Sequence, residues 1–265
     1  MFKKLALLAG LVAVSASLAG AASANHSWGG YHWARTANPF TVKLGDNLTT
    51  ADWKSDLGQT SADWSKSTVL DTTVVTGGAK GRCRPTSGRD EICNGSYGNN
   101  GWLGLAQIWL SGGHITQGTV KVNDTYFSLP QYNNSAEKEH VMCQEVGHTF
   151  GLDHQDTSGA SLNTCMDYYS NQSSSDTKST TPNAGDYDEL LCIYDPGSAG
   201  KTLSSPPHTC TGTGHLDSTN TVGATALKAP SGGPTLVPGK SKYVTHLSDG
   251  YTLITWVIWV SDVHR

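Results

Sequence analysis

The run with the clearest chemical potential begins at Gln144 and reads Gln-Glu-Val-Gly-His-Thr-Phe-Gly-Leu-Asp-His. On a helix, Gln144 and His148 lie on one face about 6 Å apart along the axis, close enough to bind one metal ion. Glu145 sits beside that face, where its carboxylate can accept a proton from metal-bound water. Gly151 permits a sharp turn that brings His154 back as a third ligand. The fourth position then stays open for water, as in catalytic zinc sites.

This run resembles the extended zinc motif of the metzincin peptidases, H-E-x-x-H-x-x-G-x-x-H followed by a Met-turn. Met166 and Tyr168 resemble that Met-turn. The resemblance covers residues 38–196 and is greatest with matrixin-like members. The positions that match the helix part of the motif are Glu145, His148, Gly151 and His154.

One ligand position departs from the family, because Gln144 stands where the motif has its first histidine. A Gln carbonyl oxygen can bind zinc and is neutral like His, but it is a weaker and less common ligand. His140 is the obvious substitute, but it precedes His148 by eight residues, about 12 Å along a helix, too far for joint ligation. We therefore predict Gln144, His148 and His154 as metal ligands, with His140 at the cleft edge or behind a ligand.

The resemblance implies an α+β fold: a metzincin-like catalytic domain with a mixed twisted sheet, an active-site helix and a Met-turn. It implies a secreted zinc-dependent endopeptidase, a monomer acting on proteins or peptides. Glu145 is the expected general base, and Tyr168 is expected to support the transition state. The alternative is a catalytically weak or inactive secreted binding protein of the same fold, in which zinc is weakened or absent.

Six cysteines in an exported chain predict disulfides, although six cysteines allow 15 pairings. A Cys83–Cys93 bridge would stiffen a short loop. Cys143 and Cys165 flank the active-site helix and the Met-turn, so a bridge between them would stabilise the metal geometry. Cys192 and Cys210 would then form the third pair.

Hydrophobic patterning predicts a mixed α/β order. The helix at 136–152 has an apolar stripe on one face and turns Gln144 and His148 toward a cleft. Thr49 is expected to cap the first helix. Residues 79–101 look like a loop. The hairpin at the C-terminus either packs on the main domain or forms a small lobe. The other expected elements are strands 40–44, 69–75, 103–110 and 119–127, helices 50–66 and 186–195, and a hairpin over 243–260.

The first residues predict a secretory signal peptide over 1–24. Lys3 and Lys4 are followed by an apolar stretch and by a small-residue cleavage site, so the mature chain begins at Asn25. A transmembrane anchor is the alternative, but the stretch is interrupted by Gly and Ser and is shorter than the ~20 residues of a span. The remaining predicted divisions are a catalytic domain at 25–196, a linker at 197–240 and an extension at 241–265.

Composition excludes some partners. Charged residues make up only 15% of the chain, and there are 30 glycines. Without Lys3 and Lys4 there are 16 basic against 22 acidic residues, a net charge of −6 with His neutral. No basic cluster is present, which argues against nucleic acid. We also expect no membrane association after signal-peptide removal.

Two weaker features remain. Asn123-Asp124 and the acid-dotted loop around Asp156 suggest structural Ca²⁺, without a complete ligand set. His26, His32 and His114 have no partners at metal-ligand spacing, so ordinary surface or core roles are expected for them.

Overall fold

The computed structural model describes residues 30–79, 81–198, 202–204, 207–210, 216–217 and 233–260. The predicted signal peptide and His26 lie outside these residues. None of the described helices is both long and apolar enough to cross a membrane.

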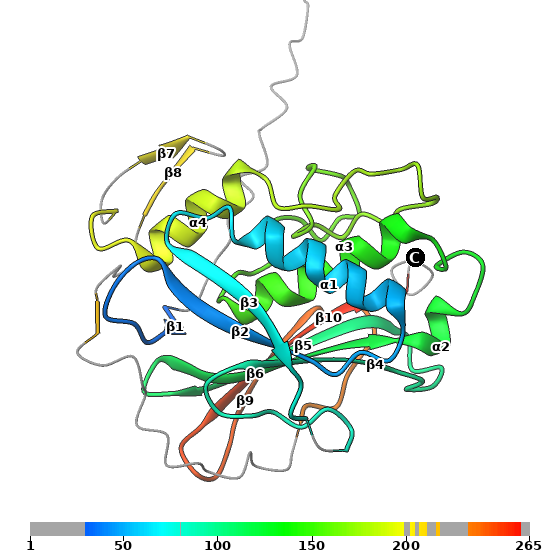
Figure 1. Cartoon of the computed structure of the whole chain (residues 1–265), viewed down its shortest axis with the longest axis horizontal. Coiled ribbons are helices and arrows are strands. Elements are labelled where there is room, and N and C mark those ends of the chain that lie inside the picture. Colours follow the sequence, from blue (N-terminus) through cyan, green and yellow to red (C-terminus); the bar gives the residue numbers. More distant parts are fainter. Residues whose placement is uncertain are drawn as a thin grey trace, which may run out of the picture.

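An eight-stranded mixed sheet forms the centre of the molecule (Figure 1). Its strand order is β3-β2-β4-β6-β5-β10-β9, and β1 pairs with β6 off this path. Strands β2, β3, β4 and β6 are parallel, whereas β5, β10 and β9 pair antiparallel. The strands are β1 His32–Trp33, β2 Phe40–Asp46, β3 Leu70–Thr76, β4 Asp90–Gly95, β5 Trp102–Ser111, β6 His114–Asn123, β9 Lys242–His246 and β10 Thr252–Trp259.

The long helices lie on one side of this sheet (Figure 1). They are α1 Ala51–Trp64, α3 Ser135–Thr149 and α4 Ala184–Tyr194, and the short α2 Asp124–Phe127 follows β6. A separate two-stranded sheet pairs β7 Thr202–Ser204 with β8 Pro207–Thr209. The predicted mixed α/β architecture is confirmed.

The predicted loop at 79–101 was wrong in part, because it contains β4 in the interior of the sheet. Its charged residues hid the strand from the sequence pattern. Asp90 and Glu91 are fully buried, yet each has a polar partner. Thr149 Oγ1 donates to Asp90 at 2.8 Å, and Arg89 lies 2.7 Å from Glu91.

Two element ends also differ from prediction. The N-cap of α1 is Thr50 rather than Thr49, whose backbone N–H instead donates to Asn94 at 2.8 Å. Residues 124–127 form α2 instead of extending the strand. The Asn123 side chain accepts from the Thr125 N–H and thereby caps this short helix.

All three expected disulfides are present: Cys83–Cys93, Cys143–Cys165 and Cys192–Cys210. Of the two alternatives for the C-terminal hairpin, the structure has the packed one. Thr252–Trp259 pairs along β5 and extends the sheet, with Leu253 and Trp256 completely buried.

Candidate active site

Helix α3 positions the predicted site by burying both of its faces. The Asn134 side chain caps its first turn by accepting from the Glu137 N–H at 3.0 Å. Met142, Val146 and Phe150 form the expected core stripe and are fully buried. The opposite face carries the candidate ligands, as the 3.6-residue period requires.

The two histidines of the motif converge. Gly151, at φ +100°, adopts the left-handed backbone that reverses the chain after α3. His148 Nε2 and His154 Nε2 lie 3.0 Å apart. His148 Nδ1 lies 2.9 Å from the Leu152 carbonyl oxygen, which can only accept, so Nδ1 carries the proton and Nε2 the lone pair. Two ligands on a tetrahedral metal with ~2.0–2.1 Å bonds are about 3.3 Å apart, so this spacing fits a shared ion.

Gln144 is bound to the Met-turn through its amide nitrogen. Nε2 donates to the carbonyl oxygens of Cys165 at 2.9 Å and Asp167 at 2.5 Å. The amide oxygen Oε1 is buried and has no hydrogen-bond partner. An orphaned buried acceptor of this kind is what a metal ligand leaves when its ion is removed. His140 is also buried and contacts the Asp167 carbonyl at 2.9 Å, consistent with a place behind the ligand.

The candidate metal site around His148 and His154 has few strong ligands. Within the described part of the chain, no third His, Cys, Asp or Glu joins His148 and His154 closely enough to hold an ion. A metal at this site would therefore depend on Gln144 Oε1 and on water.

Glu145 is the candidate base and is completely buried. Neither carboxylate oxygen has a hydrogen-bond partner of good geometry. A Cβ at Gly104 of β5 would lie only 2.5 Å from Glu145 Oε1, so only glycine fits there. Burial raises the pKa of Glu145 well above its usual range, and the nearby backbone N–H groups of Ile258 and Ala106 oppose that rise.

The Met-turn packs directly beneath α3. A Cβ at Gly147 would meet Met166 Sδ and a ring atom of Trp64, each at 2.6 Å. Glycine at this position therefore permits the close approach of the turn, which the Cys143–Cys165 disulfide also ties to the helix.

Tyr168 lies beside the histidine pair but is engaged elsewhere. Its ring is 4.7 Å from that of His154, and its hydroxyl donates to the Val257 carbonyl of β10. Burial, followed by the charge of Glu145, raises the pKa of Tyr168 well above its usual range.

Strand β10 closes the site, which corrects the expectation that Gln144 and His148 face a cleft. Trp256 stacks on His148 at 4.9 Å with an interplanar angle of 6°. Trp256 Nε1 and Lys242 Nζ donate to Asp153 at 2.9 and 2.5 Å. Burial raises the pKa of Asp153, but the neighbouring His154 and Lys242 outweigh this effect and hold the pKa below its usual range. The exposure of His154 is 8%, and that of His148 is zero.

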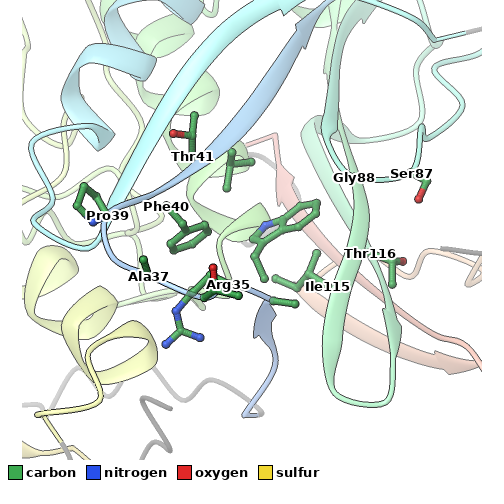
Figure 2. Close-up of a pocket in the computed structure, with 13 residues that line it drawn as sticks. Arg35, Ala37, Pro39, Phe40, Thr41, Ser87, Gly88, Ile115 and Thr116 are labelled. Atoms are coloured by element: carbon green, nitrogen blue, oxygen red, sulfur yellow. The ribbon is translucent and has the colours of Figure 1, made fainter. Parts of the chain in front are cut away.

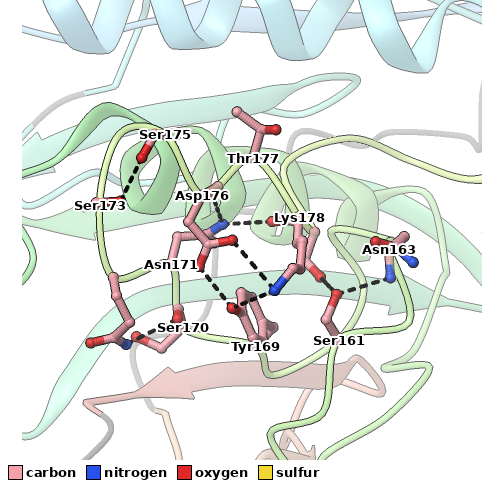
Figure 3. Close-up of polar contacts among 12 residues, drawn as sticks. Ser161, Asn163, Tyr169, Ser170, Asn171, Ser173, Ser175, Asp176, Thr177 and Lys178 are labelled. Atoms are coloured by element: carbon pink, nitrogen blue, oxygen red, sulfur yellow. Dashed lines mark hydrogen bonds and ion pairs between the residues drawn. The ribbon is translucent and has the colours of Figure 1, made fainter.

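The loop after the Met-turn is better ordered by polar contacts than its Ser- and Asn-rich sequence indicated (Figure 3). Tyr169 donates to Asp176 at 2.7 Å. The Asn171 side chain donates to the carbonyl oxygens of Asp176 and Lys178, and its N–H donates to Glu137 on α3. These bonds fix the segment that follows the candidate site against the helix.

A second cluster assembles residues for which no joint role was expected. His32 and His114 are directly paired across β1 and β6. Their ring nitrogens and an oxygen of Asp217 all lie within 4.8 Å of one another, so this His/His/Asp group could hold a metal. Ordinary roles were expected for these histidines because they have no partners at metal-ligand spacing in the sequence, but strand pairing brings them together.

A cavity of about 420 Å³ is lined by residues that include the sequence neighbours of His32 and His114 (Figure 2). Its lining includes Trp33, Arg35, Phe40 and Ile115. The cavity is separate from the residues of the metzincin-like motif.

The predicted calcium positions serve structural roles. Asn123 caps α2, and Asp124 accepts from Trp53 Nε1 at 2.9 Å. Asp156 accepts from the Ser158 N–H at 3.0 Å. Neither Asp124 nor Asp156 belongs to a group of three or more His, Cys, Asp or Glu side chains that could hold an ion among the described residues, and calcium binding stays a prediction.

No protein-family model matches the chain. No curated protein matches it either. Among solved structures, a similar one is described as "Structure of Myroilysin", with 13% identity and a TM-score of 0.36. The match covers 62% of this chain and 82% of that chain. A likeness this weak does not show what this chain does.

Proposed function

We propose that the chain is a secreted zinc-dependent endopeptidase of the metzincin type. The observation that supports this most is the convergence of His148 Nε2 and His154 Nε2 at 3.0 Å. Gln144 Oε1, which has no hydrogen-bond partner, and the buried Glu145 carboxylate lie on α3, the helix that also carries His148. The three disulfides are consistent with an extracellular protein.

Zinc bound here would polarise the scissile carbonyl and acidify a water molecule. Gln144, His148 and His154 would hold it. Glu145 would take the proton of that water and return it to the leaving amine. Tyr168 would have to release the Val257 carbonyl before its hydroxyl could support the oxyanion.

The test is Glu145→Gln, which keeps the shape of the side chain and removes the base. We expect zinc content near that of the unchanged protein and, under conditions in which the unchanged protein hydrolyses casein, hydrolysis at least about a hundredfold slower. Retained turnover would remove Glu145 from the mechanism.

A second function is favoured by two observations, the presence of Gln144 at a ligand position and the burial of the site, in which His154 is 8% exposed and His148 not at all. These fit a secreted binding protein of the same fold with weak or no catalysis. Stoichiometric zinc together with Glu145-dependent hydrolysis would exclude it, because a binding protein requires neither.

A further inference from the structure

We infer that the β9–β10 hairpin is an inhibitory cover, and that the candidate active site opens only when β10 leaves β5. The inference rests on the proposed function, because it assigns regulation to the same site.

The contacts of the hairpin converge on the site. Trp256 covers the face of His148, and the Val257 carbonyl accepts a hydrogen bond from the Tyr168 hydroxyl. Lys242 of β9 pairs with Asp153, the neighbour of His154. The hairpin therefore contacts a candidate ligand, the candidate oxyanion donor and the residue next to a second ligand.

Strand β10 also occupies the sheet edge nearest the candidate base. Ile258 is paired with Gly104, the residue that packs against Glu145. The other edge of β5 is taken by β6. With β10 removed, the N–H and C=O groups of β5 would be free beside Glu145, and a free edge of this kind accepts an extended peptide as an added strand.

Among the described strands, β9 pairs with β10 alone and β10 joins the sheet through β5 alone, so the hairpin can leave without dismantling the rest of the sheet. Its inner strand is strongly held, however. Seven of the eight residues of β10 are buried. Spontaneous opening is therefore rare, and the intact chain should be a latent enzyme.

A cross-strand disulfide tests this directly. Gln107 of β5 and Thr255 of β10 are paired residues whose side chains are hydrogen-bonded at 3.2 Å. Gln107→Cys with Thr255→Cys would lock the strands together. Gln107→Ser with Thr255→Ser is the matched control, since serine cannot form the bridge.

Access is read by diethyl pyrocarbonate labelling of His148 and His154, with mass spectrometry and the exposed His246 as internal reference. In native buffer, both site histidines should label at least about tenfold more slowly than His246. Urea below the unfolding transition should accelerate their labelling in the serine control and not in the oxidised cysteine variant. If urea accelerated the labelling equally in both variants, or if the site histidines labelled fast in native buffer, the hairpin would not be a cover of the site.

Casein hydrolysis measured on the same samples distinguishes the hairpin cover from the proposed peptidase function. Turnover that appears with labelling in the serine control supports both. Labelling without turnover would refute the proposed function and leave β10 as a cover over an inactive site.

A second inference comes from different residues: the structure assigns a transition-metal site to His32, His114 and Asp217. His114 Nε2 lies 2.8 Å from Asp217 Oδ1, and His32 Nε2 lies 3.7 Å from Oδ2. Two imidazoles with one carboxylate suit Zn²⁺, Ni²⁺, Cu²⁺ or Co²⁺ better than Ca²⁺ or Mg²⁺.

The carboxylate is held in place by backbone contacts. The Arg35 N–H donates to Asp217 Oδ2 at 3.0 Å, and the Asp217 N–H donates to the Arg35 carbonyl at 2.7 Å. The Arg35 guanidinium lies 3.6 Å from the same Oδ2. Oδ1, on the His114 side, is therefore the oxygen that would face the metal.

The experiment titrates Zn²⁺ and Co²⁺ into a His148→Ala/His154→Ala protein, which lacks the first histidine pair. We expect one equivalent to bind, with visible Co²⁺ absorption. Adding His114→Ala should weaken binding at least about tenfold, because losing even an outer partner of a ligand costs about 10–100-fold. The matched control His246→Ala should change nothing.

An absent Co²⁺ band, or equal affinity with and without His114, would overturn the site. If the His148→Ala/His154→Ala protein does not fold, the titration is replaced by a measurement of zinc stoichiometry on the otherwise unchanged chain. His114→Ala should then remove one bound equivalent, and an unchanged stoichiometry would contradict the inference.

Discussion

The two histidine clusters of this molecule differ in how they are assembled and in how they are enclosed. His148 and His154 are six residues apart and converge through one helix end, whereas His32, His114 and Asp217 come from three distant segments. The first cluster has the recognisable motif but only two strong ligands. The second has three strong ligands and no motif.

The two histidine clusters also differ in how deeply their histidines are buried. His148 is fully buried beneath Trp256 of β10, whereas the side chain of His114 is 27% exposed. The first cluster is therefore part of the hydrophobic core, whereas the second combines the buried His32 with the partly exposed His114. Changes around the first should affect stability and access together, and changes at His114 should affect metal binding more than stability.

The largest expected effect is that of Trp256→Ala, which removes the ring that covers His148. Loss of a fully buried Trp should lower the free energy of unfolding by about 3–5 kcal/mol. Urea denaturation measures this loss. Val244→Ala is the matched control, since Val244 is 55% exposed on the neighbouring strand and should change stability by less than about 0.5 kcal/mol. Similar losses in both variants would show that the cover is not core-like.

The second prediction concerns pH and the buried Glu137 on α3. Burial raises its pKa from 4.5 to about 7, so the folded state binds more protons than the unfolded state between these values. Stability therefore falls as pH rises from 4.5 to 7, by about 3 kcal/mol in all. Glu137→Gln should remove most of this slope. Melting temperatures of both proteins between pH 4.5 and 8 measure it, and parallel curves would contradict the prediction.

The third prediction concerns the approach of the Met-turn to α3. Gly147→Ala would place a methyl group 2.6 Å from Met166 Sδ and should cost about 1–3 kcal/mol. Gly58→Ala on α1 is the control, because nothing lies within 4 Å of the added carbon. It should be neutral or stabilising by up to about 1 kcal/mol. Thermal unfolding compares the two, and equal effects would contradict the steric account.

Much of the scaffold around the first cluster could be predicted from sequence, because its signals are local. The apolar stripe of Met142, Val146 and Phe150 fixed the face of α3, and Gly151 identified its end. Strand β4 was missed because its buried charges, Asp90 and Glu91, are satisfied only by partners distant in the chain.

The closing of the site and the second cluster depend on strand pairing, which the sequence does not specify. The pairing of β10 with β5 joins residues about 150 apart and covers an expected cleft. The parallel pairing of β1 with β6 sets His32 opposite His114. Asp217 lies in a Gly-, Ser- and Thr-rich stretch with no periodicity to place it.

The smallest expected effect concerns Gln144, the weak position of the first cluster. In a His114→Ala background, zinc titration reports this cluster alone. Gln144→His should add a third imidazole and lower the zinc dissociation constant about tenfold, equivalent to about 1.4 kcal/mol. The amide bonds to the Cys165 and Asp167 carbonyls are lost with and without zinc, so their cost of about 1 kcal/mol each lowers stability and leaves the gain in zinc affinity in place.

Gln144→Ala loses those same two bonds without supplying a ligand, which makes it the control for the structural cost. It should weaken zinc binding and lower the melting temperature more in the presence of zinc than with a chelator, because ligand binding contributes to stability only when zinc is present. An equal drop in both conditions would mean that Gln144 supports the Met-turn without binding metal. An unchanged zinc dissociation constant in Gln144→Ala would have the same meaning, and the first cluster would then be a two-histidine site whose remaining positions are filled by water.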